Sequence, residues 1–174
     1  MDMQLQGQHA LVTGSTAGIG FAIAKALAAE GATVTINGRS DASVGQALQR
    51  LQALLPEASL RGVTADAATA KGCEQLTAGG PPVDILVNNM GIFDPKPFEE
   101  IPDADWLRFF ETNVMSGVRL ARALLPGMKQ RNRGRIVFIS SESGICPPAE
   151  MVHYGMTKTA QLAAATKCRR LRSG

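Results

Sequence analysis

The chain has 174 residues, an apolar fraction of 45% and a net charge of +3, which fits one globular domain with a hydrophobic core. Four positive charges fall in the last eight residues, at Lys167, Arg169, Arg170 and Arg172, and the rest of the chain is nearly neutral. A basic tail on a neutral body argues against a nucleic-acid partner, which would need a basic face across the fold. No segment has the roughly 18 consecutive apolar residues that a membrane span requires.

The three cysteines, Cys73, Cys146 and Cys168, are far apart and form no CxxC pair. This spacing predicts neither a disulfide framework nor a metal site. The start of the chain lacks the basic and apolar stretches of a signal peptide. We therefore expect a reduced, cytoplasmic setting.

Short apolar, β-branched runs alternate with helix-like segments. The expected strands are His9–Thr13, Thr33–Ile36, Leu60–Thr64, Asp84–Asn88 and Arg135–Ser140. The expected helices are Gly18–Glu30, Ala42–Leu55, Thr69–Thr77 and Asp105–Gln130. The fourth and fifth strands are continuous apolar runs, which is typical of strands covered on both faces. The alternation predicts an α/β fold, a doubly wound parallel sheet with helices on both faces, as a single domain over residues 1–174.

A glycine-rich turn over residues 13–20, of sequence TGSTAGIG, joins the first strand to the first helix. Glycines allow close backbone approach, and the start of a helix offers free N–H groups to a pyrophosphate. The spacing differs from GxGxxG, and a glycine-rich turn that only packs is the alternative. Its place directly after an N-terminal strand favours phosphate binding. The expected cofactor-binding residues here are Gly14, Ser15, Thr16, Gly18, Ile19 and Gly20.

The end of the second strand indicates which dinucleotide is bound. NAD-preferring domains carry an acid at this point, whereas this chain has Arg39 and no carboxylate in residues 37–40. An ordinary surface charge is the alternative, but the absent acid and the arginine together favour NADP over NAD. Asp41 is interpreted as the cap of the next helix.

Asp66 ends the third strand and has two interpretations. Its carboxylate could accept a hydrogen bond from the adenine amino group, or it could cap the helix that begins near Ala67. Residues 88–91, of sequence NNMG, close the fourth strand, and in isolation they indicate an Asn/Gly turn.

A tyrosine and a lysine one helical turn apart follow the fifth strand. Lys158 lies four residues after Tyr154, so both lie on the same helical face. A nearby cation favours the phenolate form, which would make the phenol usable as an acid or base near neutral pH. Ser141, at the end of the fifth strand, could hydrogen-bond a substrate oxygen and hold it against the phenol. For an isolated match, a packed Tyr with a solvated Lys is the alternative.

Together these segments resemble the short-chain dehydrogenase/reductase family, in particular its 3-oxoacyl-carrier-protein reductase-like branch. TGxxxGIG, NNxG at Asn88–Gly91, Ser141 and YxxxK at Tyr154–Lys158 occur in the family's order and spacing, over about residues 5–165. The resemblance implies a Rossmann-type fold. It also implies an NADP-dependent oxidoreductase that interconverts a carbonyl and a secondary alcohol by hydride transfer.

The resemblance also assigns the site residues. Tyr154 is implied as the proton donor or acceptor, Lys158 as a ligand of the nicotinamide ribose, and Ser141 as the residue that orients the substrate. Asn113 matches the family residue that supports a proton-relay water near the lysine. The remaining expected cofactor-binding residues are Arg39 and Asp66, inferred above from the strand ends, and Asn89, Gly91, Tyr154 and Lys158, which match the family motifs. The loop of residues 145–153 is expected to line the substrate side, and the helices that carry Asn113 and Tyr154 are implied to form a homo-oligomer interface.

Family members usually continue with a sixth strand, a substrate lid and a seventh strand, which are absent from this sequence. We therefore expect a C-terminally truncated member, shortened by a frameshift or premature termination, with an atypical basic tail over residues 166–174. The segment Arg135–Ser140 is expected to form an exposed apolar edge. The alternative to a working oxidoreductase is a non-catalytic remnant that binds a dinucleotide weakly or folds only in an assembly.

Overall fold

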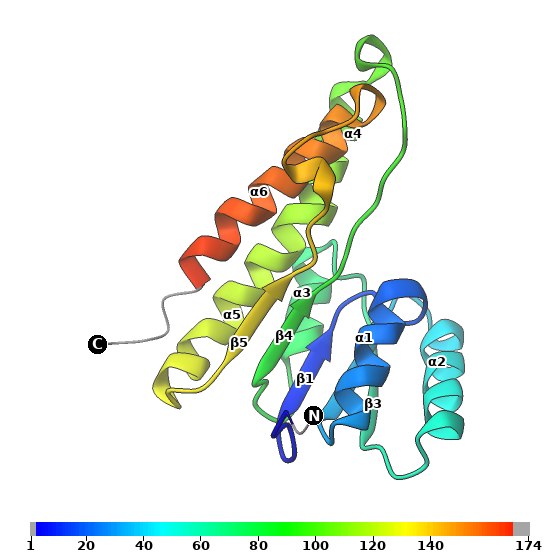
Figure 1. The fold of residues 1–174 in the computed structure, drawn as a ribbon, viewed down its shortest axis with the longest axis vertical. Helices are drawn as coiled ribbons and strands as arrows, with labels where there is room; N and C mark the ends of the chain where they lie inside the picture. Colours follow the sequence, from blue (N-terminus) through cyan, green and yellow to red (C-terminus); the bar gives the residue numbers. More distant parts are fainter. Residues whose placement is uncertain (1–2, 169–174) are drawn as a thin grey trace.

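A five-stranded parallel sheet organises the molecule, which a computed structural model describes over residues 3–168 (Figure 1). The strands are β1 (His9–Val12), β2 (Thr33–Gly38), β3 (Leu60–Thr64), β4 (Ile85–Asn88) and β5 (Arg135–Phe138). Their order is β3-β2-β1-β4-β5, so the sheet grows in opposite directions from β1. This confirms the predicted Rossmann-type fold. Ligands of such sheets bind beyond the carboxyl ends of the strands, at the point where the order reverses.

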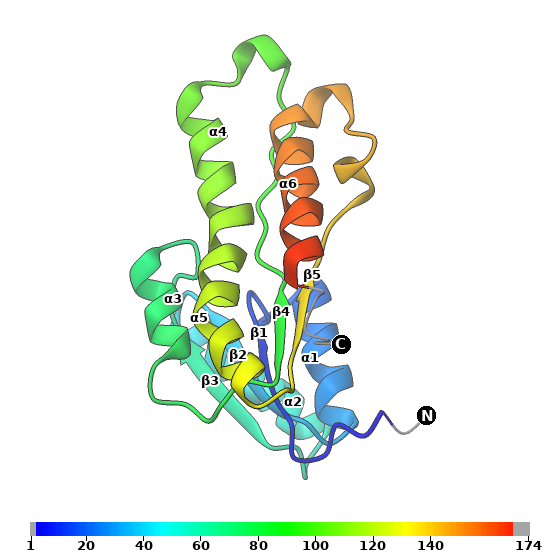
Figure 2. The same ribbon diagram turned by 90° about the vertical axis from the view of Figure 1, so that its left-hand side faces the viewer.

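The helices follow the predicted alternation. They are α1 (Gly18–Ala29), α2 (Asp41–Leu54), α3 (Ala70–Thr77), α4 (Asp103–Phe110), α5 (Ser116–Gln130) and α6 (Val152–Cys168). The predicted helix Asp105–Gln130 is one continuous rod in which a π-helical turn, Glu111–Met115, joins α4 to α5 (Figure 2). Such turns occur often at functional sites, and this one contains Asn113.

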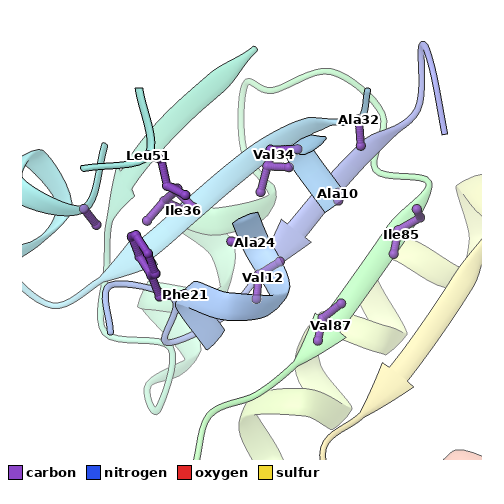
Figure 3. Packing of buried hydrophobic residues seen from close by; sticks show 12 residues of the cluster. Ala10, Val12, Phe21, Ala24, Ala32, Val34, Ile36, Leu51, Ile85 and Val87 are labelled. Atoms are coloured by element: carbon purple, nitrogen blue, oxygen red, sulfur yellow. The ribbon is translucent and has the colours of Figure 1, made fainter. Parts of the chain in front are cut away.

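Two apolar layers cover the faces of the sheet because successive strand residues point to opposite sides. Ala10 and Val12 of β1 pack with Phe21 and Ala24 of α1, and Figure 3 shows this layer. Leu11, between them in the sequence, belongs to the opposite layer with residues of α3 and α5. In Figure 2, α3 and α5 lie along that opposite side.

Two helix caps differ from the interpretations based on sequence. Ser40, rather than Asp41, caps α2: its hydroxyl accepts from the Ser43 N–H at 3.3 Å. Thr69 caps α3, so Asp66 is not the cap; its carboxylate accepts from the Ala68 N–H at 3.1 Å instead. In each case a hydroxyl stands directly before the first helical turn, where it reaches a free N–H.

Among the strands described, β5 pairs only with β4 and lies at the edge of the sheet. Its Val137 side chain is 42% exposed, as expected for an apolar edge. The charges predicted for a basic tail at Arg169, Arg170 and Arg172, and the Lys167 side chain, lie outside the described residues. No helix in the described part of the chain is long and apolar enough to span a membrane.

Candidate active site

Positive φ angles and one close backbone approach require glycine at three positions of the turn between β1 and α1. Gly14 and Gly18 have positive φ angles of 58° and 55°, which favour glycine. A Cβ on Gly20 would lie 2.4 Å from the Gly14 carbonyl oxygen and 2.5 Å from Asn89 Nδ2. The backbone therefore forms a close-packed cradle that only glycine permits, and this geometry fits the approach of a phosphate.

The first N–H groups of α1 have no side-chain cap. Ala17 at the cap position supplies no side-chain hydrogen bond, and the first turn carries no acidic residue. Free N–H groups and the positive end of the helix dipole suit an anion. Ile19, in this first turn, is 66% exposed beside them.

Ser15 differs from the other predicted phosphate ligands because its polar groups serve the fold. Its buried hydroxyl donates to the Val12 carbonyl at 2.7 Å and accepts from the Asn37 N–H at 2.9 Å. Asn37 in turn accepts from the Gly14 N–H at 3.2 Å and donates to the carbonyl of Ala65 at 3.0 Å. Sequence reasoning missed Asn37, which joins the glycine turn to the ends of β2 and β3.

Arg39 and Asp66 are exposed just beyond the ends of β2 and β3. The Thr16 methyl group lies against Gly38, since a Cβ there would come within 2.5 Å of it. The phosphate turn is thus packed against the strand end that carries Arg39.

The Asn-Asn-Met-Gly segment connects the cradle to the residues predicted to be catalytic. Asn89 Nδ2 donates to the carbonyls of Thr13 and Gly14, each at 3.1 Å. The Thr13 hydroxyl accepts from the Asn89 N–H at 3.0 Å. A Cβ on Gly91 would lie 3.6 Å from Lys158 Nζ, so this segment reaches from the phosphate turn to the buried lysine.

Lys158 and Tyr154 lie on one face of α6. The Lys158 ammonium is 5.4 Å from the Tyr154 ring centroid and donates to the Ile139 carbonyl at 2.8 Å. The Lys158 residue is only 4% exposed, and burial lowers the pKa of its ammonium below the ordinary value. The ring of Phe93 meets the Tyr154 ring edge to face at 6.4 Å.

Ser141 follows β5 on a loop that is fastened to α6. Its hydroxyl oxygen accepts from the Ser143 N–H at 3.2 Å. Ser140 donates to the Lys158 carbonyl at 3.2 Å, and Thr159 donates to the Gly144 carbonyl at 2.7 Å. These bonds fix the loop that carries Ser141 along the helix that carries Tyr154.

Asn113, in the π-helical turn, ties the loop after β4 to α6. Its Oδ1 accepts from the Ile92 N–H at 2.8 Å, and its Nδ2 donates to the Ile92 carbonyl and to Thr157 Oγ1, each at 3.0 Å. The residue is 1% exposed. The structure therefore brings Asn113, Lys158 and Tyr154 together.

His153 does not line the substrate side, contrary to the expectation for the loop that ends there. It is fully buried, with ring centroids 4.1 Å from Phe109 and 5.8 Å from Trp106. Neither ring nitrogen has a hydrogen-bond partner among the described residues, and burial lowers the pKa of the imidazole. No group of three metal-ligating side chains is found within residues 3–168.

Comparison with known proteins identifies the family. The model for short chain dehydrogenases matches residues 8–171, so the chain belongs to the short-chain dehydrogenase family. It is 50% identical to an uncharacterised oxidoreductase, YvaG, of Bacillus subtilis, over all of this chain and 66% of that protein. It is 38% identical to a D-beta-hydroxybutyrate dehydrogenase of Cupriavidus necator, over 88% of this chain and 60% of that one.

Solved structures agree with the fold. An L-sorbose reductase from Gluconobacter frateurii, in complex with NADPH and L-sorbose, matches with a TM-score of 0.91 and 33% identity, over 97% of this chain and 65% of that one. A 3-oxoacyl-(acyl-carrier-protein) reductase from Agrobacterium tumefaciens with NADP bound matches with a TM-score of 0.89 and 32% identity. The match covers 95% of this chain and 65% of that one. The chain thus spans about two thirds of the proteins it resembles.

Proposed function

We propose that the chain is an NADP-dependent oxidoreductase that interconverts a carbonyl and a secondary alcohol. The observation that carries the proposal is the buried Lys158 ammonium beside the Tyr154 ring, with Ser141 on a loop fastened to the same helix. The ammonium is poorly screened by water at this buried position and lies close to the phenol ring. Tyr154 would then donate a proton to the substrate oxygen during reduction or accept it during oxidation.

The chain's own residues divide the remaining work. Ser141, whose hydroxyl oxygen is set by the Ser143 N–H, would donate to the substrate oxygen and hold it near the phenol. When bound, NADPH supplies the hydride for reduction. The cradle of Gly14, Gly18 and Gly20 would hold its pyrophosphate, because the first α1 N–H groups carry no side-chain cap.

The preference for NADP over NAD rests on Arg39. The guanidinium is exposed at the strand end packed against the phosphate turn, and residues 37–40 contain no carboxylate. An arginine there would pair with a 2′-phosphate, whereas a ribose hydroxyl favours an acid. Asp66, Asn89 and Gly91 would complete the cofactor side.

The first experiment is thermal unfolding against rising NADPH, with NADH alongside. A ligand that binds only the folded state raises the midpoint, by about 2.7 kcal/mol of stabilisation at a hundredfold excess over Kd. We expect a larger shift with NADPH, followed by turnover of carbonyl substrates that is lost in Tyr154→Phe and Ser141→Ala. A cooperative transition that responds to neither cofactor would refute the proposal.

A second candidate is a non-catalytic form that binds a dinucleotide weakly or folds only in an assembly. The exposed β5 edge favours it, since unpaired strand edges recruit other chains. Concentration-dependent unfolding, with no turnover in any variant, would support this second candidate.

A further inference from the structure

Gln161 lies one helical turn beyond Lys158, and its side chain connects two groups of the candidate site. Its Oε1 accepts from the Lys158 ammonium at 3.1 Å. Its Nε2 donates a short hydrogen bond to the backbone carbonyl of Asn113. Gln161 is 1% exposed, so this amide is enclosed between α6 and the π-helical turn.

The orientation of this amide follows from its partners. The Lys158 ammonium only donates and the Asn113 carbonyl only accepts, so the oxygen faces the lysine and the nitrogen faces the carbonyl. The reverse orientation would set donor against donor and acceptor against acceptor. Gln161 is therefore bound at both ends in one geometry.

The described partners of the Lys158 ammonium are neutral. They are the Ile139 carbonyl at 2.8 Å and the Gln161 amide oxygen at 3.1 Å. No carboxylate of residues 3–168 lies within ion-pair distance of this ammonium. Neutral dipoles hold the ammonium in place without cancelling its charge. A carboxylate at the same position would hold it equally well but would offset its positive charge.

We propose that Gln161 is a positioning residue that holds the Lys158 ammonium charged and fixed against Asn113. The proposal rests on the function proposed above. The Gln161 amide joins the Asn113 carbonyl to the Lys158 ammonium. The family resemblance implies a proton-relay water in this same region, near Asn113 and the lysine. Gln161 acts through Lys158, because its own side chain is buried and bound to Lys158 and Asn113.

Two substitutions of Gln161 test the proposal, because they should shift the pKa of Lys158 in opposite directions. Gln161→Glu adds a negative charge beside the ammonium and raises the pKa of Lys158. Gln161→Met removes an acceptor, fills a similar volume and lowers the same pKa further. The pKa of Lys158 is read from its side-chain NMR signal, which is assigned by its loss in Lys158→Met. Gln49→Glu, on the exposed face of α2, adds the same charge at a distance and leaves the signal unchanged.

Circular dichroism verifies that each variant is folded. If both Gln161 variants moved the Lys158 pKa toward the ordinary value of a solvated lysine, or neither moved it, the proposal would be overturned.

Turnover separates this proposal from the one on which it rests. In an active chain, Gln161→Met lowers kcat by at least about tenfold with little change in KM, the size expected for one hydrogen bond to a charged group. If the unsubstituted chain shows no turnover, the proposed function fails while the NMR comparison still decides the role of Gln161.

Discussion

Asn113 and Ile92 are joined by two hydrogen bonds between one side-chain amide and one backbone residue. The amide oxygen accepts from the Ile92 N–H at 2.8 Å and the amide nitrogen donates to its carbonyl at 3.0 Å. This pairing resembles that of neighbouring strands and fixes the chain just after Gly91. The π-helical turn thereby sets the position of the segment that links the phosphate turn to Lys158.

Substituting Asn113 should therefore affect the stability of the fold. Asn113→Ala leaves the partly buried Ile92 peptide unpaired and should lower the free energy of unfolding by about 1–3 kcal/mol. Urea unfolding followed by circular dichroism measures this change. Gln75→Ala, at an exposed position of α3, should change it by less than about 0.5 kcal/mol. Equal effects of the two substitutions would contradict the pairing.

Two glycine substitutions should act in opposite directions. Gly20→Ala forces a Cβ against the Gly14 carbonyl and the Asn89 amide, so it should destabilise the fold and abolish the NADPH-induced shift in midpoint. Gly45→Ala, in α2, meets no atom within 4 Å and should stabilise by about 0.5–1 kcal/mol because alanine favours helices. Thermal unfolding with and without NADPH compares them, and an unchanged cofactor response in Gly20→Ala would argue against the cradle.

Arg39 should discriminate between the two cofactors. Arg39→Ala removes a charge-assisted hydrogen bond worth about 1.5–3 kcal/mol, so the Kd for NADPH should rise about 10- to 100-fold while that for NADH changes little. Calorimetric titration measures both. Arg122→Ala, which removes an exposed cation of α5, serves as the control. If Arg39→Ala raised the Kd for NADPH and the Kd for NADH by the same factor, Arg39 would not recognise the 2′-phosphate.

His153 should make stability depend on pH below neutrality. Burial lowers its pKa in the folded chain, so the unfolded chain, with an ordinary value of 6.5, takes up a proton first as the pH falls. The stability contribution is complete above about pH 6.5 and is lost below it, by at most about 1.4 kcal/mol per pH unit. The nearby charges oppose one another: Asp94 and Asp105 raise the pKa, whereas Lys96 and Arg108 lower it.

The difference between the unsubstituted chain and His153→Phe isolates this effect. Phenylalanine keeps a ring between Trp106 and Phe109 but takes up no proton. Urea unfolding at several pH values gives the free energy of unfolding as a function of pH. Below about pH 6.5, this free energy should fall less steeply with pH in the variant than in the unsubstituted chain, down to the pH at which the chain unfolds. The same dependence of the unfolding free energy on pH in both proteins would mean that His153 is solvated in the folded chain.

The fold class was predictable because its signals are local. Each predicted strand agrees with an observed one to within two residues at each end, since continuous apolar runs and glycine turns mark them. The caps were less predictable: Ser40 and Asp41 are both good capping residues, and only the backbone geometry decides between them. Similarly, no local pattern separates a π-helical turn from the regular helix around it.

The less predictable parts of the site depend on contacts between distant segments. Ser15 is predicted from the sequence to bind the cofactor, but the hydrogen bond from the Asn37 N–H of the neighbouring strand to its hydroxyl could not be predicted. Gln161 could have been noticed from its place three residues after Lys158 on one helix. Its bond to the Asn113 carbonyl spans 48 residues of sequence and is visible only in the folded chain.

The packing of Trp106 against His153 gives the molecule an internal optical reporter. Trp106 is the one tryptophan of the chain and lies on α4, with its ring centroid 5.8 Å from that of His153 on α6. His153 directly precedes the one tyrosine, Tyr154. Indole emission depends on the polarity of its surroundings, so one signal follows the contact between the two helices that hold Asn113 and Tyr154. Loosening of the site could thus be observed by fluorescence in the unlabelled protein before the sheet itself unfolds.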